Sequence, residues 1–251
     1  MRYYYGIKRR VNLLIFRFRN TKKDKFECPI CCYMGPFMDV VTTEGPRVHA
    51  KCPSCTASER HRIQFVVLNR VLSDKPIAEW RMLHFAPEPF FRRFFSQRFG
   101  QYETADFKMK GVDHTVDLQH LPFGDKTYDF VFASHVLEHI PDDQQAISEI
   151  RRILKPNGMA ILPVPIYSPK TIEYAEPNPL EFFHVRAPGT DYFDRYERHF
   201  SKVERFSSSS LPEKYQLFVY EDHSHLSEKE HPWLASVQGD KFNDWVPVCY
   251  V

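Results

Sequence analysis

Residues 127–165 constrain the fold most, because they predict a strand, a helix and a second strand in direct succession. Residues 128–133 are aromatic or small and apolar around a single charge, a pattern typical of a strand covered on both faces of a parallel sheet. Apolar side chains then recur with helical spacing from residue 146 until Lys-Pro-Asn-Gly at 155–158 ends the helix, and residues 159–164 are apolar again. Such a unit predicts an α/β fold with a right-handed crossover.

Polar residues follow the predicted strands at the edge where sheets of this class bind ligands. Ser134 and His135 come directly after the strand at 128–133, and Asp106 ends a predicted strand at 102–106. Residues 81–85 predict an earlier strand, and residues 112–116 another, followed by Asp117. A carboxylate at the position of Asp106 can accept hydrogen bonds from both hydroxyls of a ribose. The sequence therefore predicts a nucleoside site along this edge.

Three phrases carry a resemblance to a known family. Residues 134–142 (SHVLEHIPD) and 149–158 (EIRRILKPNG) resemble the region between the fourth and fifth strands of type 11-like class I S-adenosylmethionine-dependent methyltransferases. Residues 117–123 (DLQHLPF) resemble the adenine-side loop of that family. The resemblance covers roughly residues 81–221. It implies an α/β fold with a Rossmann-like seven-stranded sheet and helices on both faces, closed by an antiparallel pair at 202–206 and 216–221.

The resemblance also implies S-adenosylmethionine as the cofactor and assigns residues to it. These residues lie in the loops after the first four strands: Phe85, Ala86, Pro87, Glu88, Asp106, Phe107, Asp117, Leu118, Ser134 and His135. The loop after residue 85 departs from the family pattern because it contains no glycine. A zinc-ribbon interaction protein with a decayed cofactor loop is therefore an alternative to an enzyme.

Five of the six cysteines lie between residues 28 and 55. Cys28 and Cys31 form one C-x-x-C pair, and Cys52 and Cys55 form another twenty residues later. Two such pairs predict a zinc ribbon over residues 26–58, in which a closed shell of four thiolates leaves the Zn²⁺ ion a structural role. Residues 52–55 and 59–62 (ERHR) resemble a bacterial methyltransferase subgroup with such a knuckle ahead of the catalytic domain.

Three histidines are the catalytic candidates: His135, His139 and His184. We expect His135 to be the general base, because histidine ordinarily titrates near pH ~6.5 and this one follows the central strand. Residues 181–186 resemble the substrate-side segment of the family, which places His184 near the acceptor. His135, Glu138 and His139 also resemble a set that holds a divalent metal in some O-methyltransferases of the superfamily, so a second metal is an alternative.

Charge divides the chain unevenly. Residues 1–25 carry a net charge of +8, which leaves −6 for the remainder of a chain whose total is +2. This basic amphipathic segment predicts a helix that packs on its own body or a partner, rests on an anionic membrane, or touches RNA. The acidic remainder disfavours extended RNA as a substrate. We therefore rank a sugar or glycan-precursor hydroxyl first as the acceptor, a small metabolite second, and rRNA or tRNA third.

The predicted domains are the basic segment (1–25), the zinc ribbon (26–58), the methyltransferase domain (59–222) and a C-terminal extension of unassigned role (223–251). No apolar run approaches the ~18 residues that cross a bilayer, and the start lacks the pattern of a signal peptide. We expect a cytoplasmic protein, with contact at the inner face of the membrane as an alternative.

Overall fold

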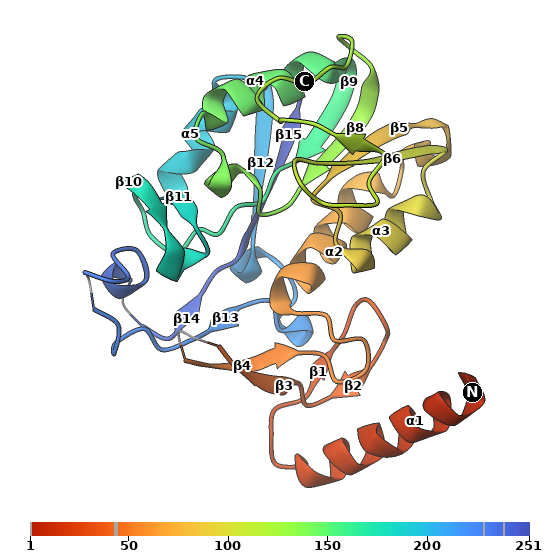
Figure 1. Cartoon of the computed structure of the whole chain (residues 1–251). Coiled ribbons are helices and arrows are strands. Elements are labelled where there is room, and N and C mark those ends of the chain that lie inside the picture. The colour runs from red at the N-terminus through yellow and green to blue at the C-terminus, as the bar shows by residue number, and fades with distance from the viewer. Residues whose placement is uncertain (1, 43–44, 228, 238) are drawn as a thin grey trace.

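Seven strands form one mixed sheet in the computed structural model, which describes residues 2–42, 45–227, 229–237 and 239–251 (Figure 1). The order across the sheet is β12-β15-β9-β8-β5-β6-β7. Neighbours from β9 to β7 are parallel, whereas β15 runs antiparallel to both β9 and β12. The strands are β5 (Arg81–Phe85), β6 (Gln101–Asp106), β7 (His114–Thr115), β8 (Tyr128–Ala133), β9 (Leu154–Ile161), β12 (Lys202–Ser207) and β15 (Trp245–Tyr250). The predicted fold class is confirmed.

Helices cover both faces of this sheet because the buried strands are apolar on both sides. On β8, Val131 and Ala133 join the core beneath α4 (Asp143–Ile153) and α5 (Phe193–Glu197). Phe130 and Phe132 join the opposite core, which includes apolar residues of α2 (Glu59–Leu72) and α3 (Pro89–Ser96). The parallel strand is therefore covered on both faces as predicted, and the carboxyl ends of the strands stay open for a site.

The last strand of the sheet was predicted wrongly. The antiparallel partner of β12 is β15, not residues 216–221, so residues 223–251 are not simply an extension: they contribute a strand between β12 and β9. Pro247 concealed this strand, because proline cannot donate a ladder hydrogen bond. It is tolerated since pairing with β9 begins only at Val248. The segment first predicted as a strand instead contains β13 (Val219–Tyr220), which pairs with β14 (Lys241–Phe242).

The cysteine-rich unit consists of two antiparallel hairpins. β1 (Phe26–Glu27) pairs with β2 (Met34–Gly35), and β3 (Met38–Val41) pairs with β4 (Pro46–Lys51). β4 lies beside β13 of the main body, and an isolated backbone bridge joins Arg47 to Glu221 (Figure 1). The unit is thus attached directly to the segment between β12 and β15.

Residues 2–19 form the expected helix α1 (Arg2–Arg19), which projects away from the body (Figure 1). Leu13 packs beside the cysteine cluster, whereas Val11, Leu14, Ile15 and Phe18 are exposed. Contact of this helix with an anionic membrane stays a prediction. Within the described ranges no helix has the length and hydropathy needed to cross a bilayer.

One further hairpin and one short turn lie near the carboxyl ends of the parallel strands. β10 (Ile172–Asn178) pairs with β11 (His184–Ala187), and a single 3₁₀ turn spans Leu137–His139 between β8 and α4. This turn carries Glu138 and His139 shortly after the end of β8. β9 begins at Leu154 rather than at residue 159, so it includes the Lys-Pro-Asn-Gly sequence at 155–158. Its pairing with β8 is irregular between Tyr128 and Phe130, opposite that sequence.

Candidate active site

Two cavities of about 640 Å³ each meet at the carboxyl ends of the parallel strands. Ala86, His135 and His139 line both of them and form their common wall. The first cavity is lined by Phe85, Ala86, Asp106, Phe107, Lys108, Val116, Asp117, Leu118, Gln119, His135, Val136, His139, Ile140 and Pro141. Seven of the ten residues assigned to the cofactor by resemblance therefore meet in one space: Phe85, Ala86, Asp106, Phe107, Asp117, Leu118 and His135.

The acids of the first cavity are held by the loops that follow their strands. Oδ1 of Asp106 accepts hydrogen bonds from the backbone amides of Lys108 and Met109, both at 2.7 Å. Oδ2 of Asp106 has no hydrogen-bond partner among the described residues, so it can accept from a ligand. Oδ1 of Asp117 accepts from the backbone amide of Gln119 at 2.9 Å. The size of the cavity and its fixed carboxylates fit a nucleoside bound across the ends of β6 and β7.

Ala86 occupies a backbone conformation that glycine adopts more readily. Its φ is 45°, in the left-handed region that an alanine rarely occupies. Its amide donates to the carbonyl of Ala105 at 2.9 Å, which fixes the turn against β6. A left-handed alanine costs roughly 1 kcal/mol. The glycine-free loop thus keeps a tight turn at the cofactor edge at a modest conformational cost.

Three residues assigned to the cofactor lie elsewhere. Glu88 and Ser134 line the second cavity, and Pro87 lines neither cavity. Glu88 is paired with Arg60, and its Oε1 lies 3.4 Å from Nε2 of His61. Burial raises the pKa of Glu88, but the hydrogen bond from His61 and the charge of Arg60 outweigh it and lower the pKa to about 2. Glu88 is therefore a fixed anion beside the common wall.

His135 has the geometry of an oriented base. Nδ1 of His135 lies 3.3 Å from Oε1 of Glu138, whose side chain is fully buried. Nε2 of His135 has no partner among the described residues, and the residue lines both cavities. Burial raises the pKa of Glu138, but the neighbouring His135, His184 and His139 lower it below its ordinary value. An ionised carboxylate can hold the Nδ1–H tautomer, which leaves Nε2 to accept a proton.

The metal-ligand set differs from the predicted one. One ligand atom from each of Glu138, His139 and His184 lies within 4.8 Å of the other two, so His184 rather than His135 completes the group. His184 is buried, its Nδ1 has no partner among the described residues, and burial lowers its pKa to about 4 despite the charge of Glu138. A carboxylate with two imidazoles suits a divalent transition metal. The residues present therefore fit such an ion.

Arg186 fixes the turn that carries Glu138, a role that the sequence did not indicate. Its guanidinium donates to the backbone carbonyls of Leu137, Ile140 and Pro141 at 3.0, 2.6 and 2.8 Å. It is buried and lies 3.6 Å from Asp143. Only its place two residues after His184 signalled that the segment matters. Arg186 is a positioning residue for the common wall.

The four predicted zinc ligands converge. Sγ of Cys28 lies 3.6 Å from Sγ of Cys55, and the same distance separates Cys31 from Cys52. A tetrahedron with Zn–S bonds of ~2.3 Å has edges of about 3.8 Å, so the sulfur atoms already stand at nearly the spacing that zinc requires. Cys32 is exposed and Cys249 is buried in the main core, which keeps both outside the cluster.

The second cavity contains residues that sequence reasoning missed. It draws on the cysteine-rich unit, the segment after β9 and the segment between β12 and β15. The missed residues are Thr42, Arg47, Arg60, Pro165, Tyr167, Phe182, Val219, Glu221, Trp233, Leu234 and Asp244. Arg60 and Phe182 lie in the phrases at 59–62 and 181–186 that resemble known methyltransferases, but neither was singled out there. No local motif marks the others, because they come together only through long-range packing.

Comparisons with known proteins agree with this geometry. Residues 96–162 match a family model described as a methyltransferase domain. An uncharacterized protein of Methanocaldococcus jannaschii is 45% identical over 58 residues, 23% of this chain and 25% of that protein. A demethylmenaquinone methyltransferase of Staphylococcus epidermidis is 36% identical over 62 residues, 25% of each protein. The chain thus spans about a quarter of the length of the curated relatives it matches.

A solved structure extends the likeness to most of the chain. An S-adenosylmethionine-dependent methyltransferase from Mesorhizobium loti aligns with 76% of this chain and 100% of its own, with a TM-score of 0.52 and 13% identity. At that identity the likeness shows the fold. The sequence match is thus to a methyltransferase domain over residues 96–162, and the solved structure shows that the fold of most of the chain is that of such enzymes.

Proposed function

We propose that this chain transfers a methyl group from S-adenosylmethionine to a hydroxyl group of a sugar, a glycan precursor or another small metabolite. The observation that supports this proposal most is the geometry of His135 in the common wall. Its Nε2 has no partner among the described residues at the place where the two cavities meet, and its Nδ1 lies 3.3 Å from Oε1 of buried Glu138. The first cavity then holds the donor and the second holds the acceptor, which we name the cofactor cavity and the acceptor cavity.

The proposed reaction is an in-line displacement. The acceptor oxygen forms a bond to the methyl carbon as the carbon–sulfur bond breaks, and the sulfur keeps that electron pair in S-adenosylhomocysteine. Nε2 of His135 takes the hydroxyl proton, while Glu138 stabilises the resulting imidazolium. The chain's main contribution is to hold the two reactants at near-attack distance, since positioning lowers the barrier most in such transfers.

The same cluster offers a variant of this reaction. A divalent ion bound by Glu138, His139 and His184 would supply Lewis-acid polarisation of the acceptor hydroxyl. In that variant His135 still faces the acceptor and removes the proton, and Arg186 keeps the Glu138 turn in place. Dependence of turnover on added metal separates the variant from the metal-free route.

The lining of the acceptor cavity supports the proposed class of acceptor. The carboxylates of Glu88, Glu138 and Glu221 outnumber the guanidinium groups of Arg47 and Arg60 in this lining. Three aromatic side chains add apolar surface: Tyr167, Phe182 and Trp233. Excess carboxylates repel a phosphate backbone, which RNA recognition requires a protein to neutralise. Carboxylates beside aromatic rings can instead hydrogen-bond hydroxyls and contact the apolar faces of a ring.

Methyl transfer from radiolabelled S-adenosylmethionine tests this proposal. The purified chain is offered nucleotide sugars, lipid-linked glycans, a small-metabolite extract and total RNA in parallel. We expect label in a sugar or metabolite fraction, and His135→Ala serves as the inactive control. Label confined to RNA would favour the rRNA or tRNA alternative. Absence of label from every pool, together with no binding of the cofactor, would favour the zinc-ribbon interaction protein.

A further inference from the structure

The two cavities draw on different parts of the chain. Every residue that lines the cofactor cavity falls between Phe85 and Pro141. The acceptor cavity instead includes Thr42, directly after β3, and Arg47 on β4, both in the cysteine-rich unit. The unit therefore contributes side chains to the space that faces the reacting group, whereas zinc ribbons that serve only as a fold support need not do so.

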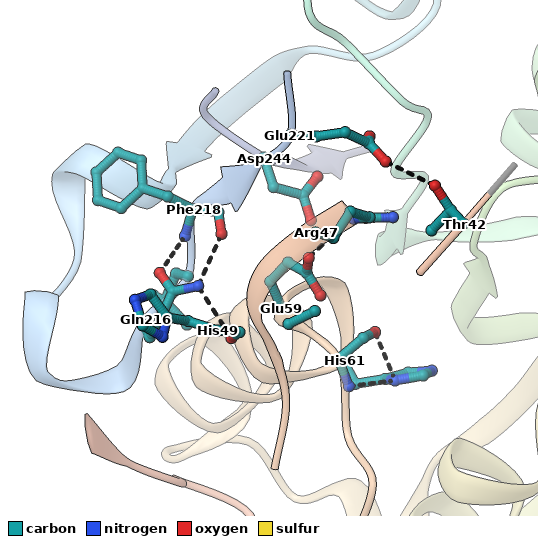
Figure 2. A network of polar contacts seen from close by, with 12 residues as sticks. Thr42, Arg47, His49, Glu59, His61, Gln216, Phe218, Glu221 and Asp244 are labelled. Atoms are coloured by element: carbon teal, nitrogen blue, oxygen red, sulfur yellow. Dashed lines mark hydrogen bonds and ion pairs between the residues drawn. The ribbon is translucent and has the colours of Figure 1, made fainter. Parts of the chain in front are cut away.

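Arg47 is surrounded by carboxyl groups of the main body (Figure 2). Its Nη2 lies 2.8 Å from Oε1 of Glu59, and its backbone is bridged to Glu221. Oε1 of Glu221 also accepts a hydrogen bond from Oγ1 of Thr42 at 3.0 Å. The side chains of Glu59, Glu221 and Asp244 are buried. This arrangement fixes the position of Arg47 in the wall and offsets its charge.

The wall also contains polar groups whose hydrogen-bonding capacity is not used within the described residues. Nε of Arg47 is buried and has no hydrogen-bond partner among the described residues. Asp244 accepts at Oδ1 from the backbone amide of Trp245 at 2.8 Å, and burial raises its pKa, which favours an uncharged carboxyl group. A donor beside carboxyl oxygens matches adjacent hydroxyls, each of which donates and accepts one hydrogen bond.

A second set of contacts ties the unit to the main body. The guanidinium of Arg62 on α2 is buried and donates to the carbonyls of Ala50 and Ala57 in the unit, at 3.0 and 2.8 Å. It also donates to the carbonyl of Gln216 in the main body, at 2.6 Å. Nε2 of Gln216 in turn donates to the carbonyl of His49 at 3.2 Å (Figure 2). These bonds hold β4 against the acceptor cavity.

We propose that the β3–β4 hairpin is the acceptor-recognition wall and that Arg47 selects an uncharged, polyhydroxylated ring. The inference rests on the proposed function, which gives the second cavity its acceptor. A phosphorylated ring is disfavoured because the carboxylate of Glu221 stands beside Arg47, and an amino sugar would gain from Glu221 but lose the match to Nε of Arg47. The hairpin is thus a specificity element of the enzyme.

Ligand-observed saturation-transfer NMR on the full chain loaded with S-adenosylhomocysteine tests the proposal. The probes are methyl glycosides and myo-inositol, with glucose 6-phosphate and glucosamine as the charged counterparts. We expect the neutral rings to bind best, and we expect Arg47→Gln to weaken them about tenfold or more, since it removes hydrogen bonds from a charged donor. The affinity for S-adenosylhomocysteine should stay within about twofold.

Matched variants guard against misfolding. Lys51→Gln removes a positive charge from the exposed end of the same strand and should change neither affinity. Because Arg47→Gln leaves Glu59 without its partner, Thr42→Val and Arg47→Lys are measured too, each with its zinc content and thermal unfolding. Equal binding of neutral rings by Arg47→Gln and the parent, tighter binding of the phosphate, or no ring binding at all would overturn the inference. Failure of the parent chain to bind S-adenosylhomocysteine would instead count against the proposed function.

Discussion

The cofactor cavity and the acceptor cavity have the same volume but different origins. The first is built from three loops and one turn within residues 85–141, each directly after a parallel strand. The second combines side chains as far apart in the sequence as Thr42 and Asp244. A site built from consecutive strand ends can be recognised from local motifs, whereas a site assembled by packing of distant segments cannot. The common wall of Ala86, His135 and His139 joins the two.

Removal of zinc should give the largest difference between the two cavities, because only the acceptor cavity includes residues of the cysteine-rich unit. Chelation is expected to unfold residues 26–58, because structural zinc contributes about 10–16 kcal/mol of apparent binding free energy to such units. Hydrogen exchange should then rise in β4 and at Glu221 and Asp244, while Asp106 and its loop stay protected. Metal analysis should give about one zinc per chain before chelation. Unchanged protection at Glu221 in the zinc-free chain would show that the ribbon does not support the acceptor cavity.

Substitution at the common wall should affect chemistry without affecting the donor. His135→Ala is expected to lower turnover by about 10² to 10⁴, the usual contribution of a general base, with little change in cofactor affinity. Glu138→Gln should also lower turnover, since it removes the carboxylate 3.3 Å from Nδ1 of His135. The measurements are single-turnover rates and calorimetric affinities. Unchanged turnover in His135→Ala would exclude the base role, and recovery on addition of Mn²⁺ or Co²⁺ would support the metal variant.

Acid should weaken the support beneath the cofactor cavity through His84. This residue is buried on β5, with Nδ1 3.0 Å from the Tyr102 hydroxyl, and burial lowers its pKa to about 3. The unfolded chain binds a proton at His84 near pH ~6.5 and the folded chain does not, so stability is full above that pH and is lost as the pH falls toward 3. The loss is about 1.4 kcal/mol per pH unit.

Urea unfolding at pH 7.5 and pH 5.5 measures this dependence in the parent and in His84→Gln. Other histidines contribute equally to both chains, so the difference between the two slopes isolates His84. A variant with the same pH dependence as the parent would show that His84 is protonated in the fold or plays no part in the acid response.

The smallest expected effect concerns the turn at the common wall. Ala86→Gly removes the conformational strain of an alanine at φ 45° in the folded state, but it also increases the conformational entropy of the unfolded chain. These effects oppose each other, so the unfolding free energy should change by less than about 1 kcal/mol. Ala160→Gly on buried β9 is the matched control and should destabilise by more, because it removes a packed methyl group and adds backbone freedom. Destabilisation of Ala86→Gly by more than its control would mean that the methyl group of Ala86 contributes contacts to the wall.

The sequence predicted features with local signals and missed those that depend on contacts between distant segments. The strand at 128–133, the acid at 106 and the cysteine pairs were predictable because each signal is local: an apolar run, a strand end, a fixed spacing. β15 was missed because Pro247 interrupts its pattern. Arg47 and Arg62 were missed because their contacts depend on the completed fold. Arg47 pairs with Glu59, and Arg62 donates to the carbonyl of Gln216, far away in the sequence.

The most direct test of the account is calorimetric titration of S-adenosylhomocysteine into the full chain. We predict one site per chain with a micromolar dissociation constant. Asp106→Ala should weaken it by about ten- to a hundredfold, the range expected when hydrogen bonds to a charged group are lost. Asp125→Ala, an exposed acid outside both cavities, is the matched control and should leave the affinity unchanged. No heat of binding in the parent chain, or equal affinity in Asp106→Ala, would contradict the assignment of the first cavity to the methyl donor.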